Sequence, residues 1–270
     1  MIEPRVPELD WQRGFARHWN GGSAVRTHIF NALSFLFPQG ERFFLDQARA
    51  IAEETHAIGA DLRAFIAQEA IHAHQHAQYN AVLEAQGYEN VSAKLAQFFE
   101  DRAYRLFSPL TRLAAVCAYE HYTAALGDYV LSYPPALEHA PRELALIWGW
   151  HAVEETEHKA VCFDLYRQAG GGWRRRVLMF LLVTVNFSRL FWRLYIDLLR
   201  RDGALARGRR LGTLVETACV MAGRHGIGWY VLGAWLRYLS PWFHPWNHDN
   251  REKMQHWLAA HQSSLRPVWE

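Results

Sequence analysis

The sequence predicts an all-α fold, and three observations lead to this prediction. Runs of helical character follow one another along the 270-residue chain and are separated by Pro and Gly, the residues that begin or end helices. No segment alternates apolar and polar residues with the period of two that indicates a strand. Two of the helical runs also contain a Glu-x-x-His motif, whose spacing places both side chains on one helix face.

The helices of the first 170 residues are delimited by breaker and capping residues. Residues 1–22 look irregular. Pro38-Gln39-Gly40 is predicted to end a first helix, Gly59 a second, and Gly87 a third that has Asp61 as its N-cap. Pro141 can occupy the first turn of a later helix. The expected helices are 23–37, 41 to about 58, 61–86, 91–107, 109–132 and 141–168.

The composition changes after the three glycines at 170–172. Residues 1–170 hold 14 Lys/Arg and 21 Asp/Glu, a charge of −7, whereas residues 171–270 hold 15 and 6, a charge of +9. Two further helices are expected at 211–239 and 249–262. The uncharged stretch 177–188 has 12 residues, fewer than the roughly 20 that a spanning helix needs, so no transmembrane segment is predicted.

The chain therefore divides into three predicted parts. Residues 1–40 form an irregular segment and a helix, and residues 41–168 form a four-helix bundle. Residues 173–270 form a basic, aromatic-rich helical extension, which packs on the bundle or on a second copy of the chain in a homodimer.

The two Glu-x-x-His motifs supply most of the candidate metal ligands. In the second motif His151, Glu155 and His158 lie at i, i+4 and i+7, within roughly 60° of one another around the helix axis. In the first motif Glu69 and His72 share a face. The neighbouring Glu154 and Glu157 point elsewhere and are expected in solvent or behind the ligands. Two such motifs make a two-metal site the first hypothesis.

Two more helices each have to contribute one carboxylate. Glu120 lies on an apolar helix, where a carboxylate is seldom buried without a partner. If the turn after this helix is centred near Leu137, Glu120 meets Glu155 and His158 at the same height. The carboxylate of the first bundle helix stays open: the candidates are Glu41, Asp46 and Glu54. For Glu41, a bend near Gly59 leaves an offset of roughly 11 Å from the first motif.

Carboxylate and imidazole ligands suit iron or manganese, and carboxylates can bridge two cations. No thiolate belongs to the set, which argues against a structural zinc site. The sequence therefore predicts a centre of two iron ions, with manganese or zinc as the alternatives. The predicted ligands are Glu41, Glu69, His72, Glu120, His151, Glu155 and His158.

This pattern resembles that of ferritin-like di-iron oxygenases, and the added His151 makes it similar to the arylamine N-oxygenase branch typified by p-aminobenzoate N-oxygenase. The segments FPQGERFF, FIAQEAIHAHQHAQYN and WHAVEETEHKAVCFDLY also resemble a bacterial family catalogued as predicted metal-dependent hydrolases. The resemblance covers about residues 35–168. It implies a ferritin-like bundle, and its Gly-Glu pair favours Glu41 over Asp46 as the first ligand.

We expect an oxygen-dependent oxidoreductase that uses dioxygen and an electron donor. The resemblance implies N-oxygenation of a small amine, whereas the hydrophobic extension suggests hydroxylation of an apolar substrate. The alternative is a binuclear metal-dependent hydrolase, which would use the same ligands, redox-inert metals and a metal-bridging hydroxide. A non-catalytic role in metal storage is a third class, against which the long aromatic extension argues.

Cysteine usage and charge indicate the setting. Three cysteines far apart, without a Cys-x-x-Cys motif, indicate a reducing, cytoplasmic protein. The N-terminus does not have the basic and apolar regions of a signal peptide. The basic extension favours peripheral contact with the inner face of the membrane through residues 173–240. No nucleic-acid-binding module accompanies this charge, so nucleic acid is not an expected partner.

Overall fold

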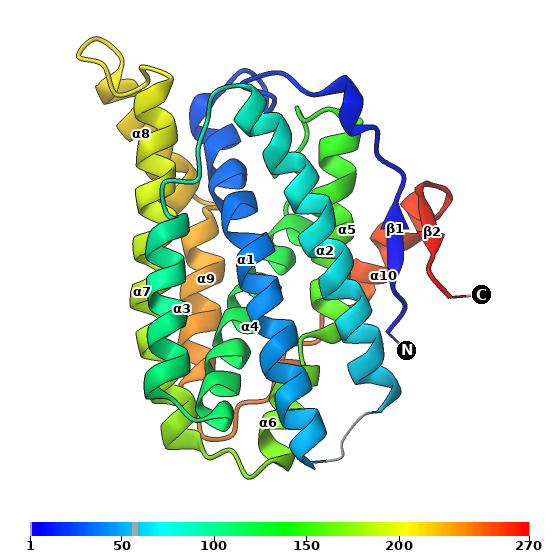
Figure 1. Ribbon diagram of the computed structural model, residues 1–270. Helices are drawn as coiled ribbons and strands as arrows, with labels where there is room; N and C mark the ends of the chain where they lie inside the picture. Colours follow the sequence, from blue (N-terminus) through cyan, green and yellow to red (C-terminus); the bar gives the residue numbers. More distant parts are fainter. Residues whose placement is uncertain (1, 56–58, 270) are drawn as a thin grey trace.

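A computed structural model of the chain describes residues 2–55 and 59–269, and it confirms the all-α class (Figure 1). The predicted helix end near Ile58 lies outside the described residues. The α-helices are α1 (Ala24–Thr55), α2 (Ala60–Ala85), α3 (Ala93–Leu106), α4 (Pro109–Ser132), α5 (Arg142–His158), α6 (Val161–Gln168), α7 (Trp173–Arg201), α8 (Arg210–Ala222), α9 (Ile227–Tyr238) and α10 (Arg251–His261).

Four of these helices form a bundle. α1 packs along α2, α4 packs along α5, and contacts between α1 and α4 and between α2 and α5 close the arrangement. The later helices surround it: α7 lies along α4 and α1, α9 packs on α4, and α10 packs on α5. The division of the chain at residue 40 falls inside α1, so the N-terminal segment and the bundle share one helix.

The first helix does not end at Pro38, as the sequence predicted; α1 continues through it to Thr55. A proline inside a helix removes the hydrogen bond to the carbonyl four residues earlier. That carbonyl belongs to Ser34, and the side chain of Asn80 on α2 donates to it at 2.9 Å. A neighbouring helix thus supplies the missing donor, which the local sequence does not reveal.

Two other predicted helices are each split in the structure. Residues 211–239 form α8 and α9, with a turn in which the Gly226 backbone N–H donates to the Gly223 carbonyl at 2.8 Å. A Cβ atom at Gly226 would lie 2.5 Å from the Met221 carbonyl oxygen, so this turn requires glycine. Residues 141–168 form α5 and α6, which are separated by Lys159 and Ala160. Neither of these two residues is a helix breaker.

The chain also contains a short sheet that the sequence pattern did not predict. β1 (Arg5–Pro7) pairs antiparallel with β2 (Leu265–Pro267), which joins the two ends of the chain. Each strand has three residues, too few for a period of two to be recognised. The pairing places the N-terminal segment against α5.

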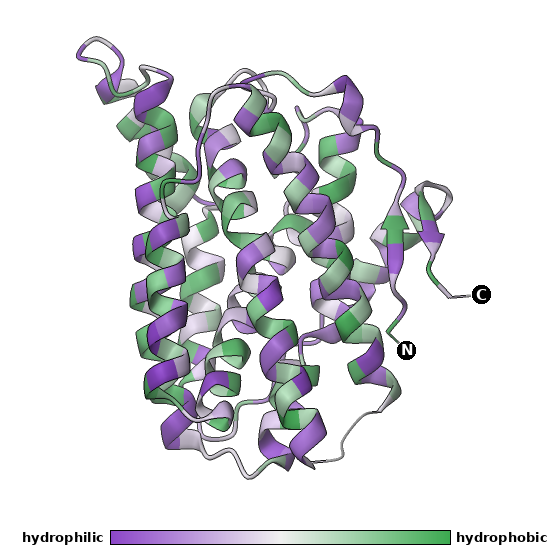
Figure 2. Cartoon of the chain, viewed as in Figure 1, coloured by the Kyte–Doolittle hydropathy of each residue, from purple (hydrophilic) through white to green (hydrophobic). Residues whose placement is uncertain are grey.

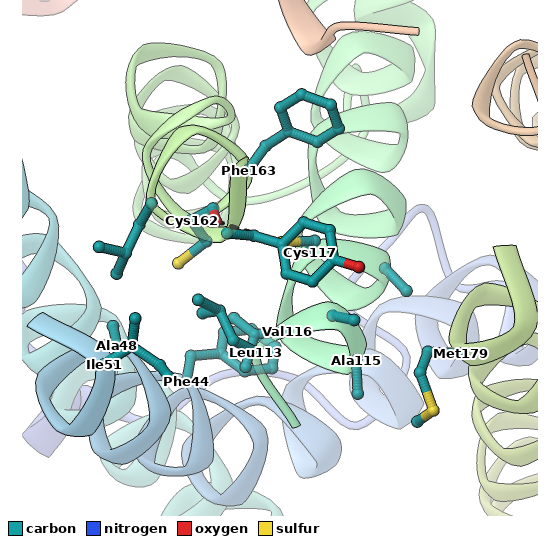
Figure 3. Close-up of a cluster of buried hydrophobic side chains, with 14 of the residues drawn as sticks. Phe44, Ala48, Ile51, Leu113, Ala115, Val116, Cys117, Cys162, Phe163 and Met179 are labelled. Carbon is teal, nitrogen blue, oxygen red and sulfur yellow. Dashed lines mark hydrogen bonds between the residues drawn. The ribbon is translucent and has the colours of Figure 1, made fainter. Parts of the chain in front are cut away.

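An apolar core fills the end of the bundle that contains Ile51 of α1 and Leu62 of α2. Figure 3 shows its centre, where Phe44 and Ile51 of α1 face Leu113 and Val116 of α4. Cys117 and Cys162 belong to this core, and the Cys117 thiol donates to the Cys162 carbonyl. This packing fixes the relative positions of α1, α4 and α6, and therefore of the other side chains that these helices carry into the bundle.

The outer face of α7 is unusually apolar for a surface helix. Hydrophobic and hydrophilic residues alternate along it in Figure 2, and only 28% of its most apolar window is buried. By length and composition alone, α7 could cross a membrane. The prediction of no transmembrane segment counted only the longest uncharged stretch and so missed the length and hydropathy of the whole helix. Within the fold, the inner face of α7 packs on α4 and α1.

Candidate metal centre

All seven predicted ligands converge inside the bundle. Each is buried, and together they come from four helices: one from α1, two from α2, one from α4 and three from α5. Their donor atoms form overlapping groups of three in which every atom lies within 4.8 Å of the others. These groups are Glu69, Glu120 and His158; Glu41, His72 and His151; and Glu69, His72 and Glu155.

The first group lies around His158. Its Nε2 atom is 3.3 Å from Oε1 of Glu69 and 3.5 Å from Oε2 of Glu120. Glu120 and His158 thus face each other across the α4–α5 hairpin, at the height that the turn near Leu137 predicts. Oε2 of Glu155 lies 3.6 Å from the same nitrogen.

The second group lies around the other two histidines. Nδ1 of His72 is 3.3 Å from Oε1 of Glu69, and Nε2 of His151 is 3.8 Å from Oε1 of Glu41. Oε1 of Glu155 lies 2.9 Å from His151 Nε2 and 3.7 Å from His72 Nδ1. Glu155 therefore offers one oxygen to each group, as a carboxylate between two cations does.

Most of these donor atoms are buried but have no hydrogen-bond partner within residues 2–55 and 59–269. The atoms are both carboxylate oxygens of Glu41, Glu69 and Glu120, together with His72 Nδ1 and His158 Nε2. Buried polar atoms in proteins are nearly always hydrogen-bonded, and an unsatisfied one costs about 1–3 kcal/mol. A cluster of eight such atoms around one point fits a pair of metal ions and does not fit a structural hydrogen-bond network.

Electrostatics within the cluster supports the same conclusion. Burial, reinforced by the nearby Glu69 carboxylate, holds the pKa values of Glu41 and Glu120 well above their usual range. Burial also raises the pKa of Glu155, but His158 and His151 outweigh it and keep that pKa well below the usual range. Several carboxylates so close together need positive charge to ionise, which two divalent ions would supply.

A second set of residues fixes the orientation of His72 and His158. His72 Nε2 lies 3.0 Å from Oε2 of Glu154 and donates to this carboxylate. His158 Nδ1 lies 2.9 Å from Oε1 of Gln68, whose amide nitrogen donates to Glu157 at 2.8 Å. Gln68 must therefore accept from His158. In both histidines one ring N–H points outward, and the other ring nitrogen faces the cluster. Burial lowers the pKa of His72, but its hydrogen bonds to Glu154 and Glu69 outweigh this and hold that pKa well above the usual range, so a metal ion at this nitrogen would displace a proton.

His151 is oriented by a longer chain of hydrogen bonds. Since Asn80 donates to the Ser34 carbonyl, its Oδ1 accepts from the Ser34 hydroxyl at 2.8 Å. Ser34 Oγ then accepts from His76 Nδ1 at 2.9 Å, and His76 Nε2 accepts from His151 Nδ1 at 2.7 Å. Burial lowers the pKa of His151 to about 4, so the ring is neutral. Its Nε2 atom is the ring nitrogen that faces the cluster, 2.9 Å from Oε1 of Glu155 and 3.8 Å from Oε1 of Glu41.

The structure decides which of the three candidate carboxylates of α1 joins the cluster. Glu41 is buried in the cluster, whereas Asp46 and Glu54 are exposed. The predicted offset of Glu41 was too large, because α1 ends at Thr55, four residues before Gly59. Glu41 is 14 residues before the end of α1, and Glu69 and His72 are 9 and 12 residues after the start of α2. The remaining difference of five and two residues is about 8 and 3 Å.

Glu154 and Glu157 were expected in solvent or behind the ligands, and the structure places them behind the ligands. Glu154 orients His72, and Glu157 accepts from Gln68 and pairs with Arg5 at 3.0 Å. The Arg5 backbone N–H also donates to Glu154 at 2.9 Å, so β1 covers this side of the site. Gln68 and His76 were not predicted to orient ligands. Their positions beside the first motif, at i−1 and i+7 from Glu69, were the available signal.

Other histidines and carboxylates lie outside this centre. His74 is exposed, and His121 is paired with the Ala234 carbonyl at 2.8 Å. A further group of potential ligands, His18, His28 and Asp202, lies at the end of α7. There the Asp202 carboxylate also accepts from Tyr88 and Arg17, so it already has four donors. We interpret this group as an anchor between α7 and α1.

Comparison with known proteins identifies one family. The family described as "Predicted metal-dependent hydrolase" matches residues 3–249, which includes most of the C-terminal extension that the resemblance at 35–168 did not reach. Neither a curated protein nor a solved structure matches the chain. Metal dependence is thus indicated by the family and by the His/Glu clusters, and the match over nearly the whole chain shows that the protein belongs to the family of predicted metal-dependent hydrolases.

Proposed function

We propose that the cluster is a binuclear metal centre and that the protein is a metal-dependent hydrolase. One ion would be held by Glu69, Glu120 and His158, and the other by Glu41, His72 and His151, with Glu155 between them. The observation that supports this proposal is the set of eight buried, unpartnered donor atoms directed at one centre. The three fixed histidine tautomers support it further.

The residues of the site explain why hydrolysis would depend on metal. Bound divalent ions polarise a carbonyl or phosphoryl oxygen and lower the pKa of water. Cys117 and Cys162 lie in the apolar core, where burial raises the pKa of both thiols well above the usual range, so neither fits the role of nucleophile. The nearest hydroxyl, on Thr123, donates to Glu155 and thereby holds that carboxylate in place. The aromatic rings of Phe37 and Phe65 pack on His151 and His158 and exclude solvent.

A second candidate is oxygen-dependent oxidation at two irons, with an electron donor. The observation that favours it is the origin of the ligands. Two Glu-x-x-His motifs and single carboxylates from two other helices are the donor set of di-iron carboxylate bundles. The sequence resemblance implies the same chemistry. Both reactions require the same centre and differ in the metal and in the need for oxygen.

Metal analysis of matched variants tests the centre first. We expect two divalent ions per wild-type chain and fewer than one in Glu69→Gln. Glu84→Gln, an exposed position on the same helix, should keep both. Wild-type levels of metal in Glu69→Gln would refute the centre.

Activity assays then separate the two reactions. Turnover of ester, amide or phosphoester substrates under anaerobic conditions would support hydrolysis. Activity that needs both oxygen and a reductant would contradict it and support the second candidate.

A further inference from the structure

A large apolar cavity ends at the proposed metal centre. It measures about 430 Å³ and lies between α1, α3, α4 and α7. At its inner end it is lined by Glu41 and by Thr123, the residue that donates to Glu155. The volume falls in the usual range for binding sites of small organic ligands, roughly 300–1,000 Å³. Any molecule that fills the cavity would therefore reach the centre beside Glu41.

The walls indicate what kind of molecule fits. Most of the lining side chains are aliphatic or aromatic, among them Phe44, Phe99 and Phe187. Polar groups are few, and two of them are engaged within the protein: the Asn186 amide nitrogen donates to Tyr119 at 2.8 Å, and Glu100 accepts from Gln39 at 3.0 Å. Burial of a hydrocarbon against such walls is favourable by roughly 25 cal/mol per Å².

Two exposed arginines line the cavity, Arg102 of α3 and Arg189 of α7. Within residues 2–55 and 59–269, Arg189 has neither a hydrogen bond nor an ion pair, and Arg102 only stacks on Phe98, at 5.4 Å. Arginines bind carboxylate and phosphate groups through two parallel hydrogen bonds. Two arginines without carboxylate partners beside an apolar cavity complement a ligand with an anionic end.

The surface around the mouth is also apolar. Leu106 of α3 and Leu182 and Val185 of α7 line the cavity and are 63%, 47% and 69% exposed. A hydrocarbon chain that enters between them contacts apolar side chains from the surface to the interior.

We propose that this cavity binds a long, unbranched hydrocarbon chain with an anionic end group, and that such a molecule is the substrate of the centre. The anionic group stays at the mouth with Arg102 and Arg189, and the chain extends inward to Glu41. This inference rests on the proposed metal centre. Water does not cleave the bonds of an alkyl chain, so a bound chain whose hydrocarbon end reaches the metals would support the second, oxidative candidate over hydrolysis.

Calorimetric titration with dodecanoate tests the binding site. We expect one molecule bound per chain, roughly fourfold weaker binding for each methylene removed, and at least tenfold weaker binding of dodecanol. Arg102→Gln combined with Arg189→Gln should reduce dodecanoate affinity about tenfold or more. Arg175→Gln, an exposed arginine of α7 away from the cavity, should leave it unchanged.

Steric block provides a second variant. Ala103 lines the cavity and is half-buried, so Ala103→Trp should fill the space and abolish binding while the helix content stays at the wild-type level. Binding that survives both this variant and the loss of both arginines would overturn the proposal.

The orientation is tested with Mn²⁺-loaded protein and ¹³C-labelled dodecanoate. The terminal methyl resonance should broaden more than that of the carbon next to the carboxylate. The reverse order would show the carboxylate at the metals and would refute the proposal. Metal content measured on the same samples separates the two failures. Two ions per chain without dodecanoate binding overturns only this inference. Dodecanoate binding without metal overturns the metal centre, and with it the role of the chain as substrate, but keeps the binding site.

Discussion

Replacement of Glu120 by Gln should make the metal-free protein more stable and the metal-loaded protein less stable than the wild type. Both carboxylate oxygens of Glu120 are buried without a hydrogen-bond partner. The ligand atoms of Glu69 and Glu120 lie no more than 4.8 Å apart. Two unit charges at that distance repel by about 3.5 kcal/mol with an effective dielectric constant of about 20.

Without metal, protonation relieves part of this repulsion, because burial and Glu69 hold the pKa of Glu120 well above its usual range. We therefore expect Glu120→Gln to stabilise the metal-free protein by about 1–3 kcal/mol, which raises Tm by roughly 2–4 °C per kcal/mol. With metal at a hundred times its Kd, a single site adds about 2.7 kcal/mol to the wild type. The variant loses a ligand and should gain much less.

Thermal unfolding in a chelator and in Mn²⁺ measures both effects, and the order of the two Tm values should reverse. Asp46→Asn is the matched control, since this carboxylate is exposed on α1 and should change neither Tm. A variant that is destabilised in the chelator and stabilised by Mn²⁺ as much as the wild type would show that Glu120 has a structural role. The argument from buried carboxylate repulsion would then be wrong.

Three further predictions concern the surroundings of the centre. His76→Phe removes the acceptor that fixes the tautomer of His151, so metal affinity should fall about 10–100-fold. Competition with a chelator measures this affinity. An unchanged affinity would show that the hydrogen bonds behind His151 do not contribute to metal binding. Asp202 is buried, a state that raises its pKa, but its donors, His28 first among them, hold that pKa well below the usual range. Its ionised form therefore stabilises the fold above the unfolded pKa of about 3.9. Asp202→Asn should lower the free energy of unfolding in denaturant by about 2–4 kcal/mol at pH 7, and this difference should shrink as the pH falls below about 4. A difference that does not change with pH would contradict this reading. Finally, we propose that the exposed apolar face of α7 contacts a membrane surface, so Leu181→Ser with Val185→Ser should reduce co-sedimentation with anionic vesicles. Val268→Ser changes an exposed apolar residue beside the β1–β2 pair, away from α7, and should not reduce it; equal sedimentation of all three proteins would end the proposal.

Much of the fold could be predicted because its helices carry local signals. α4 begins at Pro109 and ends at Ser132, as predicted, since Ser108 caps it and prolines follow it. The errors occur where a distant residue compensates for a local breaker or where no breaker marks a break. Asn80 lets α1 pass through Pro38, and the end of α5 has no signal in the sequence.

The ligand set shows the same limit. Helical spacing alone grouped Glu69 with His72, and His151 with Glu155 and His158, because residues three and four apart share a helix face. Helix register alone did not separate Glu41 from Asp46, since register depends on where two helices bend, which is a property of the packed bundle; only the Gly-Glu pair of the resemblance favoured Glu41. The sequence by itself therefore determined the all-α class and the chemistry that the Glu-x-x-His motifs can perform. Only the tertiary structure decided which carboxylate of α1 joins them, which side chains orient the histidines and where the apolar cavity opens, since these depend on contacts between helices that no local pattern encodes.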